Sequence, residues 1–152
     1  MLIRQATDKD LLKIIGLFRE MDGEDGLAPD ESKAIWTKIN EYPYYKIFVI
    51  EDRELLIGTC SLVIIDNLGH LGAKLAVAEN MIISQEFRGK GIGNQLMQFV
   101  MARAKEEKCY KLMLSSNTKR VLAHKFYENL GFEPHGISFT TNFDYNKNLK
   151  RA

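Results

Sequence analysis

The chain has 152 residues, of which 45% are hydrophobic and 27% charged, and its 21 basic and 20 acidic residues leave a formal net charge of +1. This length is typical of one domain that buries a sizeable core without disulfides or structural metals. The balanced charge argues against a nucleic-acid partner, which a basic face would attract. We therefore expect a single domain over residues 1–152, with a frayed polar tail at about 146–152.

The cellular compartment is predicted from targeting signals and cysteine usage. The longest apolar runs are much shorter than a membrane-spanning helix, and the first residues contain neither the basic nor the apolar region of a signal peptide. The cysteines, Cys60 and Cys109, are too few for a disulfide framework and fit a reducing compartment. These features predict a cytoplasmic protein that binds neither membrane nor nucleic acid.

The first half of the chain contains both helical and extended apolar patterns. Thr7 and Asp10 resemble a capping box, and apolar residues from Leu11 onward recur at helical spacing. A loop at 21–30, rich in glycine and acidic residues, ends this helix. In chain order, the patterns predict a strand at 2–5, a helix from 11, a helix at about 30–40, a hairpin of strands at 46–50 and 55–65, and a strand at 74–83.

The second half combines longer helices with short strands. Gly131 follows the last helix, at the position where a left-handed residue commonly ends a helix. The order of elements predicts a mixed α/β (α+β) fold with a largely antiparallel first half, which differs from the strict alternation of a doubly wound sheet. The predicted elements are a helix at 91–108, a strand at 110–114, a helix at 120–130, and one or two final strands from Phe132 and 137–143.

The segment at 79–93 carries the clearest chemical signal. A strand runs into a glycine-rich turn at 88–93, and a helix starts there. Glycines allow the backbone to approach a ligand, and the unpaired N–H groups at a helix start favour a phosphate. Arg88 and Lys90 add positive charge. The spacing matches neither a Rossmann fingerprint nor a Walker loop, and a tight strand-to-helix turn with solvated charges is the alternative interpretation.

Two motifs resemble the hallmarks of one family. Arg88-Gly89-Lys90-Gly91-Ile92-Gly93 fits the Q/R-x-x-G-x-G/A signature of the GNAT superfamily of N-acetyltransferases, and 123–132 (AHKFYENLGF) is similar to its second hallmark, A-x-x-F-Y-x-x-x-G-F. The motifs lie in the expected order, separated by a helix and a strand, and the resemblance is strongest over 74–139. Arg120 stands where many members of the family carry Asn.

The resemblance implies the GNAT fold, a central mixed, mostly antiparallel sheet flanked by about four helices, with a splay between two central parallel strands. It also implies acetyl-coenzyme A as the cosubstrate. No Cys or His pair has the spacing of zinc ligands, so we expect no metal. Main-chain groups of Met81 and Ile83 would bind the pantetheine arm as an added strand would, and backbone amides of the turn would hold the pyrophosphate. The turn residues assigned to the coenzyme in this way are Arg88, Gly89, Lys90, Gly91, Ile92, Gly93 and Asn94.

Two side chains are candidates for the proton transfers that amine acetylation requires. Glu79, in a strand built mostly from Ala, Val, Met and Ile, would take a proton from the ammonium, directly or through water. A solvated or salt-bridged carboxylate is the alternative. Tyr127 would donate a proton to the departing coenzyme sulfur, although its helical spacing with Ala123 and Leu130 also fits a core aromatic.

The sequence thus resembles an N-acetyltransferase that acts on a primary amine. A non-catalytic acyl-coenzyme A binding or regulatory module, and a protein N-terminal or lysine acetyltransferase, are the alternatives. Homodimers are common in the family, so a homodimer is included among the expected partners. Acids near the first two helices predict a small cationic acceptor through field steering, unless they form only a solvated loop; they are Glu20, Asp22, Glu24, Asp25, Asp30 and Glu31.

Overall fold

A computed structural model describes residues 1–22, 27–141 and 143. The chain divides into two compact units, Met1–Leu114 and Ser115–Ala152. A single domain over 1–152 stays a prediction, and the tail at 146–152 lies outside the described residues.

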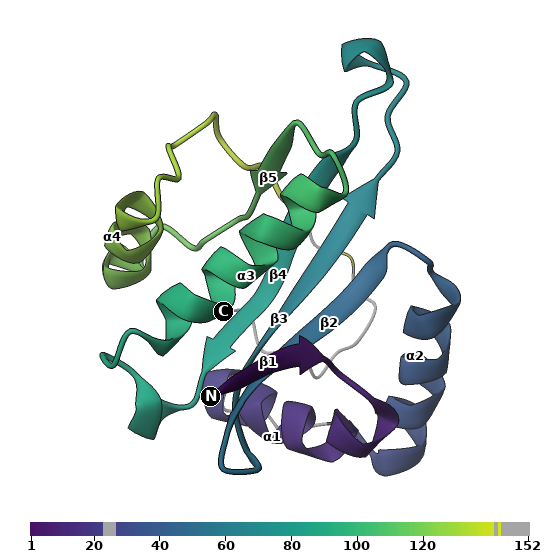
Figure 1. The fold of residues 1–152 in the computed structure, drawn as a ribbon, viewed down its shortest axis with the longest axis vertical. Helices are drawn as coiled ribbons and strands as arrows, with labels where there is room; N and C mark the ends of the chain where they lie inside the picture. The colour runs from purple at the N-terminus through teal and green to yellow at the C-terminus, as the bar shows by residue number, and fades with distance from the viewer. Residues whose placement is uncertain (23–26, 142, 144–152) are drawn as a thin grey trace. The chain divides into compact units, whose positions relative to one another are not determined.

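The strands of the described chain lie in the first unit and form one five-stranded sheet (Figure 1). Their order across the sheet follows the chain, and neighbouring strands are antiparallel except for β4 and β5, which are parallel. The sheet is therefore mixed and mostly antiparallel, as predicted. Its strands are β1 (Leu2–Gln5), β2 (Tyr45–Asp52), β3 (Leu55–Ile65), β4 (Leu75–Ile83) and β5 (Lys111–Met113).

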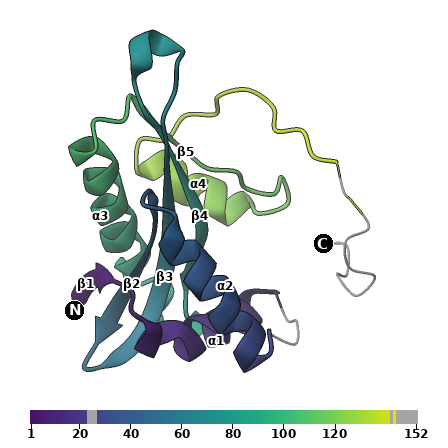
Figure 2. The same ribbon diagram turned by 90° about the vertical axis from the view of Figure 1, so that its right-hand side faces the viewer.

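Helices of the first unit cover both faces of this sheet (Figures 1 and 2). α1 (Leu11–Asp22) and α2 (Pro29–Glu41) pack on one face, and α3 (Ile92–Glu106) packs on the other. With the helix of the second unit, the described chain has the four helices that the predicted fold class requires. The remaining elements are α4 (Val121–Asn129) and the short 3-10 helices η1 (Asp8–Asp10), η2 (His70–Gly72) and η3 (Gln85–Phe87).

Alternation along β2 divides the core between the two faces. Ile47 and Val49 lie in one hydrophobic cluster with Ile14 of α1. Phe48, which lies between them in the strand, instead meets Phe99 of α3, and the two ring centroids are 5.2 Å apart. Because successive side chains of a strand point to opposite faces, β2 is buried on both sides. This explains why its sequence is apolar without the polar alternation of a half-exposed strand.

The observed bounds agree with the predicted helices and with the predicted strands up to β5, but the final strand at 137–143 is wrong. None of the described residues in 132–143 lies in a strand. Ile137, Phe139 and Phe143 are 81%, 90% and 82% exposed. Alternating apolar residues form a stable strand only where neighbouring strands supply hydrogen bonds and a packed face, and no described strand pairs with this segment.

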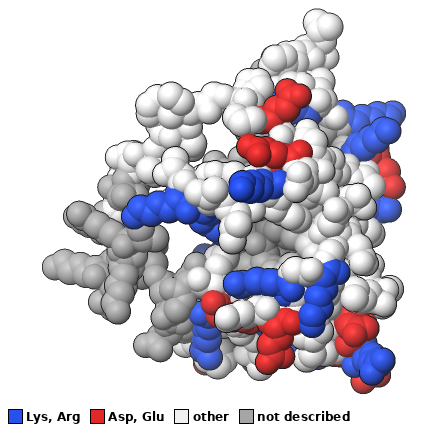
Figure 3. All heavy atoms as spheres, turned by 90° about the vertical axis from the view of Figure 1, so that its left-hand side faces the viewer, with Lys and Arg blue, Asp and Glu red and all other residues white. Residues whose placement is uncertain are grey.

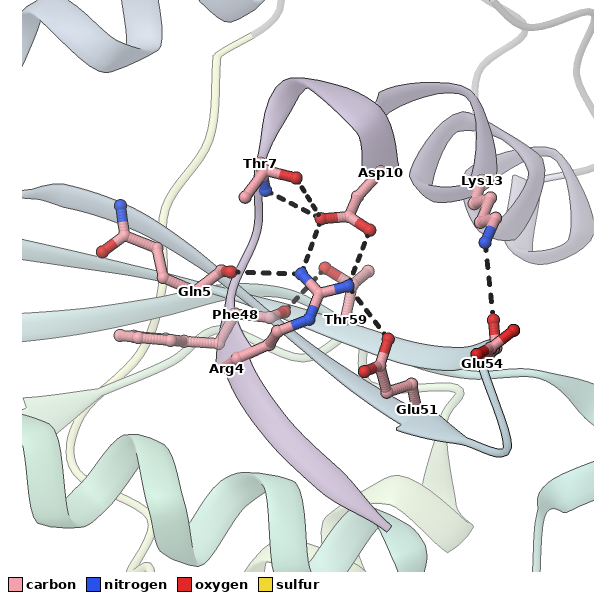
Figure 4. Close-up of polar contacts among 9 residues, drawn as sticks. All are labelled: Arg4, Gln5, Thr7, Asp10, Lys13, Phe48, Glu51, Glu54 and Thr59. Atoms are coloured by element: carbon pink, nitrogen blue, oxygen red, sulfur yellow. Dashed lines mark hydrogen bonds and ion pairs between the residues drawn. The ribbon is translucent and has the colours of Figure 1, made fainter.

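A network of ion pairs fixes the N-terminal segment of the first unit (Figure 4). Arg4 of β1 donates two hydrogen bonds to the carboxylate of Asp10, at 2.7 and 2.9 Å, and one to Glu51 of β2 at 2.9 Å. Asp10 is only 4% exposed, and it also accepts hydrogen bonds from the backbone N–H and the hydroxyl of Thr7. The capping pattern predicted at Thr7 is therefore part of a larger network that ties β1, η1 and β2 together.

The hydrogen bonds from Arg4 hold the pKa of Asp10 well below its usual value, while burial acts in the opposite direction. A carboxyl group whose pKa is lower in the folded chain stabilises the fold above its unfolded pKa. This stabilisation is lost as the pH falls through the folded pKa. The network should therefore contribute fully at neutral pH and progressively less in acid.

Arg4→Met should lower the free energy of unfolding by about 1–3 kcal/mol at neutral pH, because the buried carboxylate of Asp10 loses its main partner. The difference from the wild type should shrink as the pH falls below about 4, where Asp10 becomes protonated in the unfolded chain. Urea denaturation at neutral and acidic pH measures both effects. Arg103→Met is the control, since the ion pair of Arg103 with Glu106 is 44% and 57% exposed and should contribute about 1 kcal/mol or less. Equal losses in the two variants would contradict the special role of the network.

Candidate active site

The partners of β4 change along its length. On one side, β4 pairs with β3 from Leu75 to Ile83. On the other side, the parallel strand β5 pairs only with Leu75, Ala76 and Val77. Beyond Val77, no strand among the described residues pairs with this edge, so its backbone N–H and C=O groups are not used by a β-ladder, and the carbonyl of Ile83 instead accepts a hydrogen bond from the side chain of Arg88. The pairing of the parallel strands thus ends after three positions, as the predicted splay requires, but β5 lies at the edge of the described sheet and not at its centre.

A β-bulge interrupts the β3–β4 ladder opposite this free edge. Between the pairs Ser61–Glu79 and Thr59–Ile82, β3 contributes one residue and β4 contributes two. One of the two, Asn80, has a left-handed φ of 54°, a conformation that Asn adopts more readily than most residues. Bulges are frequent beside active sites, where they re-aim side chains. Asn80 was not among the predicted site residues, and its only signal was a polar residue within an apolar strand.

Glu79 lies immediately before the bulge and is exposed. Its neighbours Ala76 and Ala78 are buried, so alternation along the strand places Glu79 on the opposite face from them. Burial, and to a smaller extent the charge of Glu79, raise the pKa of Cys60 to about 12. Cys60 is therefore a neutral, buried thiol with no nucleophilic character, whereas the carboxylate of Glu79 is accessible to a ligand.

The predicted glycine-rich turn leads from η3 into α3. Gly89 and Gly91 have φ values of 74° and 75°, which residues with a side chain rarely adopt. Gly91 is the N-cap of α3, so the first N–H groups of the helix have no intrahelical partner. A Cβ atom added to either glycine would meet no atom within 4 Å. The turn therefore combines unpaired N–H groups with open space, as a bound phosphate requires.

Two cationic side chains of the turn lie against its own backbone and rings. The Nε of Arg88 donates a hydrogen bond to the carbonyl of Ile83 at 2.9 Å. The Nζ of Lys90 lies 5.1 Å from the centre of the Phe87 ring. Both residues are exposed, so their charges remain at the surface of the turn.

The acidic residues near α1 and α2 lie in different environments. Glu20 of α1 accepts hydrogen bonds from the backbone N–H of Gln85 and the hydroxyl of Ser84. Asp30 and Glu31 lie exposed in the first turn of α2, where acids interact favourably with the helix dipole. The described acids thus have different roles, Glu20 as a hydrogen-bond acceptor and Asp30 and Glu31 as acids at a helix start. Outside the described residues are Glu24, Asp25 and the side chain of Asp22.

In the second unit, α4 carries Tyr127 and ends at Gly131 as predicted. Gly131 has a φ of 88°. The N–H of Phe132 donates to the carbonyl of Tyr127 at 3.1 Å, and that of Gly131 donates to Glu128 at 2.9 Å, which together form a Schellman motif. The ring of Tyr127 packs edge-on against Phe126 and Phe132, with centroid distances of 5.0 and 5.8 Å. The motif and the two rings therefore fix the orientation of Tyr127 within this unit.

Metal ligands and membrane-spanning helices were searched over the described residues only. No group of three or more His, Cys, Asp or Glu side chains in this part of the chain is arranged to hold a metal ion. None of its helices is long and apolar enough to cross a bilayer.

The family to which the chain belongs follows from its similarity to known proteins. Residues 43–134 match the family model described as "Acetyltransferase (GNAT) domain". Because this match covers more than half of the 152 residues, the chain belongs to the GNAT family of acetyltransferases.

Individual relatives agree with the family. A Drosophila melanogaster protein named as a probable glucosamine 6-phosphate N-acetyltransferase is 34% identical over 112 residues, which make up 70% of this chain and 50% of that protein. The chain thus matches about half the length of this relative. The structure of glucosamine-6-phosphate N-acetyltransferase from Arabidopsis thaliana has a TM-score of 0.83 and 25% identity, covering 94% of this chain and 98% of that one. A Bacillus halodurans structure described as a transcriptional regulator has a TM-score of 0.87 and 26% identity, with coverages of 93% and 99%.

Proposed function

We propose that this chain transfers the acetyl group of acetyl-coenzyme A to a primary amine. The proposal rests mainly on one observation within the first unit: an edge of β4 that lacks a partner strand among the described residues and a glycine-rich turn follow each other directly along the chain. The edge of β4 at 81–83, which no described strand pairs with and whose Ile83 carbonyl accepts the Nε of Arg88, runs through η3 into the glycine-rich turn at the start of α3. Coenzyme A has two matching parts in sequence, an amide-containing pantetheine arm and a pyrophosphate. Membership of the acetyltransferase family supports the same assignment.

The coenzyme would be bound mainly by the backbone. Met81 and Ile83 would exchange hydrogen bonds with the pantetheine amides, as an added strand would. The N–H groups of 88–94, with the positive end of the α3 dipole, would hold the pyrophosphate. Arg88 and Lys90 would add formal charge. In full, the residues assigned to the coenzyme are Met81, Ile83, Arg88, Gly89, Lys90, Gly91, Ile92, Gly93 and Asn94.

The proposed reaction is a direct transfer. The neutral amine attacks the acetyl carbonyl, a carbon–nitrogen bond forms, and the carbon–sulfur bond breaks, so the products are an amide and the coenzyme thiol. One proton must leave the ammonium to give this neutral amine, one must reach the departing sulfur, and the nitrogen loses a second proton as the amide forms. We assign the first transfer to Glu79, directly or through water, and the second to Tyr127. The exposure of Glu79 beside the bulge and the fixed orientation of Tyr127 in its helix support these roles.

The acceptor that we propose is a small-molecule primary amine. The names of the Drosophila and Arabidopsis relatives make glucosamine 6-phosphate the first compound to test.

The expected preference for a cationic amine has less support, because Glu20 is hydrogen-bonded to Gln85 and the other described acids lie at a helix start. Basic and acidic side chains are interspersed on the face drawn in Figure 3. The preference for a cationic acceptor would be supported if a diamine proved a better substrate than glucosamine 6-phosphate and if salt weakened the apparent affinity for the diamine.

A non-catalytic acyl-coenzyme A binding or regulatory module is the second candidate, and the description of the Bacillus halodurans structure favours it. Thiol release from acetyl-coenzyme A across a library of amines and peptides separates the candidates. Release with small amines supports our proposal, and release with peptides alone supports a protein N-terminal or lysine acetyltransferase. Binding without release supports the module. The homodimer and the cytoplasmic location stay predictions, which light scattering and cell fractionation measure.

Gly91→Val should weaken coenzyme A binding by roughly tenfold or more, since a left-handed backbone is costly for residues other than glycine. The new side chain would also occupy the open space over the turn. Calorimetric titration with coenzyme A measures the effect. Gly72→Val is the control, because Gly72 also has a left-handed φ, of 80°, and open space around it, but lies in the hairpin before β4. Equal affinities in the two variants would contradict the phosphate-binding role of the turn.

Tyr127→Phe should lower turnover by roughly 10- to 1000-fold, the range expected when one acid or charge-stabilising donor is lost. Coenzyme affinity should change little, because the effect belongs to the transition state in which thiolate charge develops. The ring contacts with Phe126 and Phe132 should survive. Steady-state kinetics at saturating coenzyme measure the loss, and Tyr110→Phe, a hydroxyl deletion in the first unit, should leave turnover unchanged. Near-normal turnover of folded Tyr127→Phe would remove this residue from the mechanism.

Glu79→Gln should show a defect that depends on pH. Without the base, the enzyme must rely on amine that is already neutral, so the defect in kcat/KM should diminish as the pH rises toward the pKa of the acceptor amine. The pH profile of kcat/KM measures this trend. Asp66→Asn removes another exposed carboxylate, which lies just after β3, and should match the wild type throughout. A Glu79→Gln defect that is constant over pH would argue for a structural role of the carboxylate.

A further inference from the structure

The structure connects α1 to the turn that follows β4. Glu20 lies in the last turn of α1, and its Oε1 accepts hydrogen bonds from the backbone N–H of Gln85 and, at 3.4 Å, from the hydroxyl of Ser84. The two ends of this contact are 65 residues apart in sequence. Glu20 therefore holds the first residue of η3, the short helix that precedes the glycine-rich turn.

The position of Glu20 is unfavourable for α1 itself. The C-terminal end of a helix carries partial negative charge, so an acid in the last turn is destabilising, whereas a base is favoured there. Glu20 is also exposed and makes no contribution to the core. The contacts that offset this cost are those with Ser84 and Gln85.

Hydrogen bonds continue from Glu20 toward the glycines. The carbonyl of Gln85 accepts the N–H of Arg88 at 3.3 Å, and the carbonyl of Ser84 accepts the N–H of Phe87 at 2.9 Å. The N–H of Ser84 is held by the carbonyl of Ile57 in β3 at 2.9 Å. Arg88 directly precedes Gly89, so the backbone that leads into the left-handed turn is fixed from two sides, by β3 and by Glu20.

We propose that Glu20 is a positioning residue for the coenzyme pyrophosphate. By accepting the N–H of Gln85, it holds η3 in the orientation that directs the amides of 89–93 to one point. This inference rests on the proposed function, because it assumes that the turn binds the coenzyme. It assigns to Glu20 a role in coenzyme affinity in place of the acceptor steering that its charge suggested.

Coenzyme A titration of three variants tests the assignment. Glu20→Ala should raise the Kd by about 3- to 30-fold, the range for losing one capping hydrogen bond. Glu20→Gln keeps an oxygen that accepts both hydrogen bonds and should remain within about threefold of the wild type. Glu41→Ala is the matched control, because Glu41 is also an exposed acid in the last turn of a helix, and its carboxylate makes no hydrogen bond or ion pair with the described residues. It should leave the Kd unchanged.

A truncated donor separates positioning from a general loss of structure. Acetyl-pantetheine lacks the pyrophosphate, so the wild type and Glu20→Ala should use it equally well. With acetyl-coenzyme A, Glu20→Ala should raise the KM of the donor and leave kcat at saturation unchanged, since the role of Glu20 is uniform binding.

Each outcome separates this inference from the proposed function. A wild type that binds no coenzyme A would overturn both. A wild type that binds it, with unchanged affinity in folded Glu20→Ala, would overturn the role of Glu20 alone. Equal defects of Glu20→Ala with both donors would also overturn it. So would a Glu20→Gln variant whose coenzyme affinity and melting temperature fall together, because both results indicate a global structural role. Selective loss with acetyl-coenzyme A and rescue by Gln would support it.

Discussion

The unequal pairing of β4 is the constraint on which the rest of the structure depends. One edge of the strand is paired with β3 from Leu75 to Ile83, with one bulge, whereas the other is paired with β5 over only three positions. The long ladder, together with helices on both faces of the sheet, holds β4 in place. Its remaining edge can therefore offer backbone hydrogen-bonding groups without the strand losing its own support. The bulge at Asn80 lies within this same segment.

The turn beyond β4 extends this edge into a second binding element. Left-handed glycines change the direction of the chain over a few residues, and α3 then presents the unpaired N–H groups of its first turn. Such a turn has few contacts of its own, so residues distant in sequence must hold it. Ile57 and Glu20 supply these contacts from β3 and α1. The proposed site is therefore built mainly from backbone.

Local patterns predicted most of the fold because helices, strands and turns leave periodic or compositional signals. The helix stop at Gly131 and the turn glycines followed from backbone geometry. The prediction of the final strand was wrong because the alternation of Ile137 and Phe139 shows only that a segment can be extended. It does not show that a neighbouring strand is present to pair with it. Glu20 was grouped with nearby acids because its contact with Gln85 spans most of the first unit. Long-range hydrogen bonds of this kind have no local signature, and the motif resemblance, not periodicity, suggested Glu79 and Tyr127.

A crystal structure with coenzyme A bound is the most direct test of the central claim, that the free edge of β4 and the following turn form one coenzyme site. We predict the pantetheine arm beside Met81 and Ile83 and the pyrophosphate over 88–93, with the β3–β4 ladder unchanged. A coenzyme bound to another surface would contradict the account. So would a β5 that pairs with β4 as far as Ile83 and closes the edge.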